Sequence, residues 1–216
     1  MQKDSYYSIG APATGEYKDR GSRFIAYAWP VSDEEQALAH LADLRKTHFK
    51  AVHHCFAWRI GPEGERWRAN DDGEPSGSAG RPILNQIDAA GLSDVCVVVV
   101  RYFGGVLLGV PGLINAYREA AAEALRQAPR IERILTRALA INAAYPLTPD
   151  LMHALHKLGV QAADERYDEY GCAFTLHIRA GEYDKTLLQL KAALHKTSVE
   201  EARTLDWPDG MQCKSI

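Results

Sequence analysis

The order of hydrophobic and polar positions divides the chain near residue 136. Before this point, apolar runs are uneven and separated by glycine. The pattern there predicts strands over 22–31, 51–60 and 95–100, and helices over 82–90 and 111–126. A further helix is expected after Ser32, because Ala37, Leu38, Leu41 and Leu44 repeat at helical spacing. Ser32, followed three residues later by Glu35, predicts the N-cap of the first helix. A polar stretch, 61–81, is expected to be a long functional loop.

After residue 136 the pattern is more regular. It predicts strands over 138–145, 160–167, 172–179 and 199–205, and helices over 149–158 and 183–195. This βαββαβ order is that of ferredoxin-like domains. We therefore expect an α+β protein with two domains, 1–135 and 136–216.

Composition narrows the class of protein. The chain has 216 residues, of which 46% are hydrophobic and 25% charged, as in folded soluble proteins. Its formal charge of −3 does not favour nucleic acid, so such binding requires a local patch. The longest apolar run, 95–100, is too short to span a bilayer, and no signal peptide opens the chain. Four scattered cysteines predict free thiols in a cytoplasmic protein: Cys55, Cys96, Cys172 and Cys213.

The segment 95–126 combines a strand, a glycine-rich turn and a helix start. Amide groups gathered at such a turn favour anions, together with the helix dipole. Arg101 lies at the strand exit, and Tyr102 or Phe103 offers a stacking face. The glycines at this turn are Gly104, Gly105, Gly109 and Gly112. The alternative interpretation is that they only let the helix pack tightly on the sheet.

An acidic, glycine-rich motif lies within the polar stretch. It consists of Asp71, Asp72, Gly73, Glu74, Pro75, Ser76, Gly77, Ser78, Ala79 and Gly80. Its carboxylates suit metal or acid–base chemistry, but a solvated turn is the more ordinary interpretation. Ser76 and Ser78 lack the strand–turn–helix context of a nucleophile elbow. His53 and Cys55 share a strand face, yet two ligands alone make a weak metal site. We therefore predict no metal and no cofactor.

These motifs together resemble the YigZ/IMPACT family. The matching segments are 22–26, 53–55, 71–84, 100–105, 112–113 and 116–117. The resemblance implies a first domain that is a two-layer α/β sandwich, like the second domain of a small-subunit ribosomal protein. It implies a second domain like the last domain of elongation factor G. Eukaryotic relatives regulate translation, and the family motifs imply no enzymatic activity. The chain departs from the family pattern at Pro111, which removes an amide donor, and at Asn115, which replaces a basic residue.

Two functions from different classes follow. The first is a non-enzymatic cytoplasmic regulator of translation or its stress response, whose partner is RNA, the ribosome or a translation-associated protein. Arg81 and Arg101 would contact phosphate or an acidic partner, Tyr102 and Phe103 would stack, and the acidic motif would orient an arginine or the loop. The alternative is an enzyme that binds a small molecule or nucleotide phosphate at the glycine-rich turn.

Overall fold

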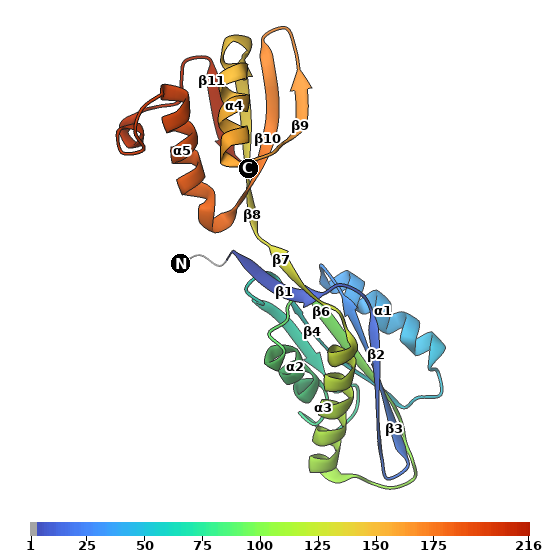
Figure 1. Ribbon diagram of the computed structural model, residues 1–216. Coiled ribbons are helices and arrows are strands. Elements are labelled where there is room, and N and C mark those ends of the chain that lie inside the picture. Colours follow the sequence, from blue (N-terminus) through green and yellow to red (C-terminus); the bar gives the residue numbers. More distant parts are fainter. Residues whose placement is uncertain (1–3) are drawn as a thin grey trace. The chain divides into compact units, whose positions relative to one another are not determined.

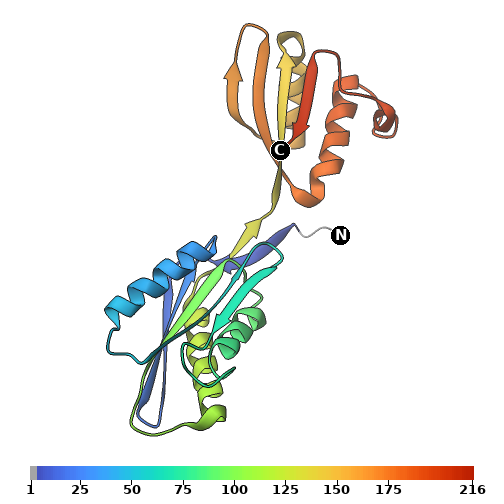
Figure 2. The same ribbon diagram turned by 180° about the vertical axis from the view of Figure 1, so that it is seen from behind.

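The computed structural model describes residues 4–216, which form two compact units (Figures 1 and 2). The first unit is Ser5–Arg133, and the second is Ile134–Ile216 together with Asp4. Helices and strands are mixed in both units, so the chain has the expected α+β class. No helix within the described residues is long and apolar enough to cross a membrane.

A five-stranded antiparallel sheet forms the centre of the first unit. Its strands, in spatial order, are β2 (Ala13–Asp19), β3 (Ser22–Pro30), β6 (Val95–Tyr102), β4 (His53–Ile60) and β5 (Arg66–Asn70). A separate two-stranded sheet pairs β1 (Ser5–Ile9) with β7 (Arg130–Ile134). The sequence pattern did not predict β1, β2, β5 or β7, because these strands are short or rich in exposed polar residues.

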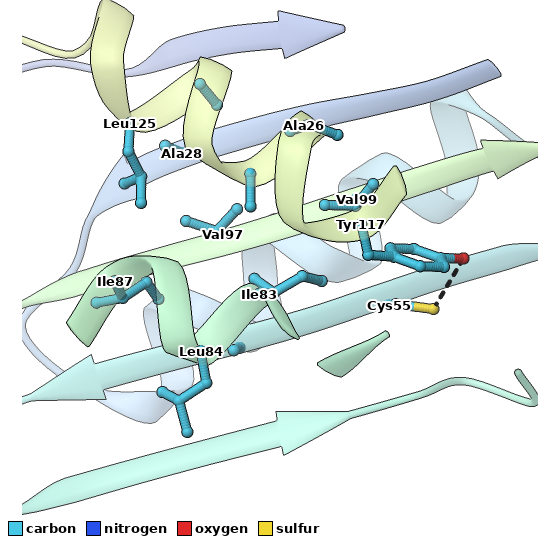
Figure 3. Packing of buried hydrophobic residues seen from close by; sticks show 14 of the residues in the cluster. Ala26, Ala28, Cys55, Ile83, Leu84, Ile87, Val97, Val99, Tyr117 and Leu125 are labelled. Atoms are coloured by element: carbon cyan, nitrogen blue, oxygen red, sulfur yellow. Dashed lines mark hydrogen bonds between the residues drawn. The ribbon is translucent and has the colours of Figure 1, made fainter. Parts of the chain in front are cut away.

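Helices cover both faces of this sheet. On one face, α2 (Gly80–Ala89) and α3 (Gly109–Gln127) close the main core, which Figure 3 shows from close by. On the other face, α1 (Glu34–Thr47) packs its apolar side on alternate residues of β4 and β6. The strand over 95–100 is therefore buried on both faces, as its continuous apolar run predicts. Helix α1 adds a layer to the expected two-layer sandwich.

Two local predictions in the first unit are wrong in detail. The N-cap of α1 is Asp33 rather than Ser32, since the Asp33 carboxylate accepts a hydrogen bond from the Gln36 amide at 2.8 Å. The polar stretch 61–81 is not one long loop, because β5 pairs with β4 inside it and α2 begins at Gly80.

The second unit has the strand–helix–strand–strand–helix–strand order expected from its sequence. Its elements are β8 (Thr136–Ala144), α4 (Thr148–Leu158), β9 (Ala162–Tyr167), β10 (Gly171–Arg179), α5 (Tyr183–His195) and β11 (Met211–Ser215). The sheet is antiparallel, in the order β11-β8-β10-β9. Three short 3-10 helices connect these elements: Tyr145–Leu147, Ala180–Glu182 and Glu201–Thr204.

The predicted last strand, 199–205, is wrong. Most of this segment is a 3-10 turn, because Ser198 and Glu201 form a reciprocal capping box, each side chain accepting from the other's amide at 3.2 Å. The final strand is β11, whose Met211 and Cys213 side chains join the apolar core of the second unit.

Candidate functional site

A row of three side chains crosses the sheet of the first unit at the end of β6. Arg101 lies directly opposite Phe24 of β3 and His53 of β4 in the strand register. The Arg101 guanidinium lies over the Phe24 ring at 5.4 Å and is almost completely buried. Because side chains alternate along a strand, the next residue, Tyr102, belongs to the opposite face. There its hydroxyl lies 2.8 Å from Nδ1 of His48.

Glu74 occupies the centre of the site. Its Oε1 accepts a 2.6 Å hydrogen bond from Nη1 of Arg101 and a 2.7 Å hydrogen bond from the Tyr117 hydroxyl of α3. All three residues are buried. A buried carboxylate is costly unless it is paired and hydrogen-bonded, and both conditions hold here. The loop before α2 therefore docks on the sheet through this contact, and the acidic motif orients Arg101.

Tyr117 and Cys55 extend this network into the core (Figure 3). The Cys55 thiol donates to the carbonyl of Asp71 at 3.0 Å, and its sulfur lies 3.3 Å from the Tyr117 oxygen. Burial raises the pKa of the Tyr117 hydroxyl and of the Cys55 thiol well above their ordinary values. Both groups therefore stay protonated at neutral pH, and neither is activated as a nucleophile.

Asp71 and Asp72 hold the loop rather than face solvent as a ligand set. The Asp71 carboxylate accepts from the amides of Gly77, Ala79 and Gly80, and so caps the start of α2 from a distant part of the loop. Asp72 accepts from Arg45 and from the backbone amide of His54, each at 2.7 Å. No group of three or more potential metal ligands occurs among the described residues.

His53 is fixed in orientation by the same loop. Its Nδ1 lies 2.8 Å from the Asp72 carbonyl, which only accepts, so Nδ1 carries a proton. Its Nε2 lies 3.9 Å from Oε1 of Glu74. His53 and Cys55 share a strand face, as expected, but Cys55 is engaged with Asp71 and Tyr117.

The glycines of the turn have different roles. A Cβ added at Gly104 would lie 1.9 Å from the carbonyl carbon of Gly21, so Gly104 permits a close backbone approach to the β2–β3 turn. Gly105 and Gly109 have φ values of +86° and +72°, which favour glycine. Gly112 lies within α3, where an added Cβ would come 3.0 Å from Leu108. Close packing thus accounts for Gly104, whereas backbone conformation accounts for Gly105 and Gly109.

The loop between β6 and α3 and the first turns of α3 expose apolar side chains. We call this set the apolar loop surface: Phe103, Val106, Leu107, Val110 and Ile114. Leu107 is the most exposed of the set, at 81%, and a group of exposed apolar side chains often marks an interaction surface. The Arg101 guanidinium lies 5.6 Å from the centre of the Phe103 ring, so the surface continues into the buried network.

A cavity of about 440 Å³ opens beneath this loop, and we call it the loop cavity. Its walls are largely apolar, and they include Val52, Pro75, Phe103, Leu107, Val110 and Leu113. Its polar lining residues are His53, Glu74 and Arg101. This volume and this mixture of walls and polar groups are typical of small-molecule sites.

Some residues singled out in the sequence lie outside this arrangement. Arg81 is exposed and lies over the Trp67 ring at 5.5 Å, away from the Glu74 network. Ser76 is exposed, and the buried Ser78 hydroxyl donates to the Pro75 carbonyl at 2.6 Å. Tyr117 lies in the family-matching segment 116–117, but sequence reasoning gave it no role in the site, because a phenol on an otherwise apolar helix face is a weak signal.

Fold and site together define a two-unit α+β protein whose glycine-rich turn carries an apolar surface above a buried ionic network. Comparison with known proteins supplies its family. Residues 20–125 match the family model described as the Impact N-terminal domain. A Thermus thermophilus protein named "IMPACT family member in pol 5'region" is 45% identical over 160 residues, which are 74% of this chain and 86% of that protein. The chain therefore belongs to the IMPACT family.

Further similarities extend this result. The Bacillus subtilis protein "IMPACT family member YvyE" is 40% identical over 141 residues, which are 65% of each chain. A solved structure titled "Crystal structure of an hypothetical protein" is 28% identical with a TM-score of 0.67, covering 100% of this chain and 98% of that one. Both units therefore have a counterpart in one solved structure.

Proposed function

We propose that this protein is a non-enzymatic regulator of translation, or of a stress response that controls translation. It acts by binding a translation-associated protein through the apolar loop surface. Membership of the IMPACT family supports the general role in translation, because the resemblance to this family implies such a role. The observation that carries the finer proposal is the exposure of Leu107 and its apolar neighbours on the turn.

A protein partner fits this surface better than RNA does. Contact with RNA depends on cations that neutralise phosphate. Arg101 is buried and already paired with Glu74, so its charge is compensated within the protein. Pro111 and Asn115 replace an amide donor and a basic position at the helix start. The exposed side chains that remain are aliphatic or aromatic, which are the groups enriched in the buried centre of protein interfaces.

Binding also fits the site better than catalysis does. The Cys55 thiol and the Tyr117 hydroxyl have raised pKa values and remain protonated. The Ser78 hydroxyl is engaged with a backbone carbonyl rather than with a base. Asp71 and Asp72 are saturated by backbone amides and Arg45. The groups from which a nucleophile would be drawn therefore have structural partners.

The test is sedimentation of native lysate on a sucrose gradient, with detection of the wild-type protein and two variants. Leu107→Asp places a charge at the centre of the apolar loop surface. Leu38→Asp is the matched control, because Leu38 is a 40% exposed leucine on α1, on the other face of the sheet. We expect wild type and Leu38→Asp to migrate with ribosomal fractions at low and moderate salt, and Leu107→Asp to remain at the top.

Three results would contradict the proposal. Association that falls steeply with salt would indicate RNA as the partner. Equal behaviour of Leu107→Asp and wild type would place the contact elsewhere on the chain. A wild-type protein found only at the top of the gradient would contradict binding to a translation-associated partner.

A further inference from the structure

One polar residue of the loop cavity, Arg101, has unused hydrogen-bond donors. The Arg101 guanidinium carries five N–H donors, and its bond to Glu74 is its single hydrogen bond within residues 4–216. Its Nε is sealed from solvent and has no acceptor in the described part of the chain. Arg101 is only 6% exposed, yet it lines the cavity. A buried guanidinium with unused donors lacks an oxygen partner.

The start of α3 adds a second attraction for negative charge. Gly109 and Val110, the first residues of this 19-residue helix, line the same cavity. No side chain caps the amides at this end, and the first turn carries no acidic residue. The first N–H groups of a helix lack intrahelical acceptors and coincide with the positive end of the helix dipole. Pro111 removes one of these donors, but the amides of Gly109 and Val110 remain. An anion in the cavity would therefore receive hydrogen bonds from the guanidinium and from these two amides.

The remaining lining residues restrict the chemical character of the rest of the ligand, beyond its anionic group. Oε1 of Glu74 already accepts from Arg101 and Tyr117, so this carboxylate leaves other Arg101 donors unused. The cavity walls are apolar side chains from the residue before β4, the acidic motif, the loop before α3 and the first turns of α3. A strongly hydrated ion would lose solvation against these walls, whereas a compact apolar body would gain from burial.

We propose that the loop cavity binds a small organic acid, with its carboxylate on Arg101 and the α3 amides and its apolar body between Phe103, Val110 and Leu113. This site does not depend on the proposed protein partner, because binding is measured on the purified chain alone. A ligand here would also touch the apolar loop surface, because Phe103, Leu107 and Val110 belong both to that surface and to the cavity lining.

The experiment is isothermal titration of the full chain with 3-phenylpropionate and with its neutral amide, 3-phenylpropionamide. We expect the acid to bind at least roughly tenfold more tightly, since hydrogen bonds to charged groups are the stronger ones. In amide NMR spectra, the acid should shift the signals of Gly109, Val110 and Gly112. Phenyl phosphate and a peptide that ends in leucine are titrated alongside, to separate other sources of an anionic group.

Two variants locate the site without disturbing its ionic pair. Val110→Trp fills the cavity and should weaken binding of the acid at least roughly tenfold, since the apolar body loses its space. Leu38→Trp is the matched control, an exposed apolar position on α1 outside the cavity lining and outside the apolar loop surface, and should leave the affinity unchanged. Equal binding of acid and amide, no binding of either, or equal effects of both variants would overturn the proposal. Tighter binding of phenyl phosphate or of the peptide would overturn the assignment to a free carboxylic acid.

Discussion

The two units bury very different chemistry. Nine polar or charged residues are buried in the described chain, and eight of them belong to the first unit: Ser8, Ser22, His54, Glu74, Ser78, Ser93, Asp94 and Arg101. The second unit buries only Thr186 among the described residues. Its core is otherwise apolar, with residues such as Leu151, Leu176 and Leu190 fully enclosed.

The two kinds of core contribute differently to the stability of each unit. An apolar core gains stability from burial alone and tolerates exchange among hydrophobic residues. A buried ion pair offers little net stability over an apolar core, yet its removal on one side is strongly destabilising. In the first unit, the Glu74–Arg101 pair holds the loop before α2 against the end of β6, and the glycine-rich turn follows directly after β6. We infer that the buried Glu74 and Arg101 serve the site, whereas the apolar core of the second unit serves folding.

The largest expected effect comes from breaking the buried pair. Glu74→Ala leaves the Arg101 guanidinium buried without its carboxylate, and we expect the free energy of unfolding of the first unit to fall by about 3–5 kcal/mol. Urea unfolding followed through amide signals of the first unit measures this. Glu16→Ala is the control, because Glu16 pairs with Arg23 and Lys18 on the surface. If Glu74→Ala lost only about 1 kcal/mol or less, as exposed pairs do, the buried pair would not differ in energy from a surface pair.

The second prediction replaces a core residue in each unit by methionine. Leu176→Met keeps an apolar side chain of similar volume, and we expect a loss below about 1.5 kcal/mol in the second unit. Arg101→Met is also apolar and of similar length, but it leaves Glu74 buried without its cation, so the loss should be about 3 kcal/mol or more. Urea titration of both variants tests this, and equal losses would show that the two cores obey the same rule.

The third prediction separates two adjacent glycines. Gly104→Ala places a Cβ against the backbone of Gly21, so we expect a loss of up to about 3 kcal/mol and a displaced turn. Gly105→Ala meets no atom within 4 Å, so its cost should be only the roughly 1–2 kcal/mol of a left-handed backbone. Thermal unfolding of the two variants gives the order. A reversed order would mean that conformation, rather than close packing, dominates at the turn.

The smallest expected effect is a pH dependence confined to the first unit. Burial lowers the pKa of His54 below its ordinary value of 6.5, and the nearby Asp72 carboxylate only partly opposes this. Below pH 6.5 the unfolded chain therefore binds more protons than the folded one. The stability that neutral His54 contributes is fully present above pH 6.5 and is lost as the pH falls through its folded pKa.

His54→Phe should flatten this slope, whereas His177→Gln, at an exposed position of β10, should leave it unchanged. Urea midpoints measured between pH 5 and 7.5 check both expectations. An unchanged slope in His54→Phe would assign the acid sensitivity to another group, such as His48, whose pKa is also lowered by burial.

The sequence predicted the second unit better than the first, and the reason is physical. Regular alternation and helix-capping residues mark nearly every element after residue 136. The exception is the segment 199–205, which was predicted as a strand but is held in a turn by the Ser198 capping box. In the first unit, β1 pairs with the distant β7 and Leu92, which local pattern does not reveal. Strands β2 and β5 pair with their sequence neighbours β3 and β4, but their many exposed polar residues hide the strand pattern.

The site shows the same limit. Arg101 and Glu74 were singled out by their motifs, and the expectation that the acidic motif orients an arginine is met by their contact. Tyr117 was part of the family match, but its role in the site was not predicted, because a single phenol on an apolar helix face resembles an ordinary core residue. The cavity and the apolar loop surface depend on how the loop folds over Arg101. This fold of the loop cannot be predicted from composition alone.

The proposed binding site for the protein partner is the apolar loop surface. Hydrogen–deuterium exchange of the full chain, free and bound to the ribosomal fraction with which it sediments, tests this most directly. The account predicts that slowed exchange on binding centres on residues 103–114, with little change in the second unit. Slowed exchange confined to other surfaces, or none in 103–114, would contradict it.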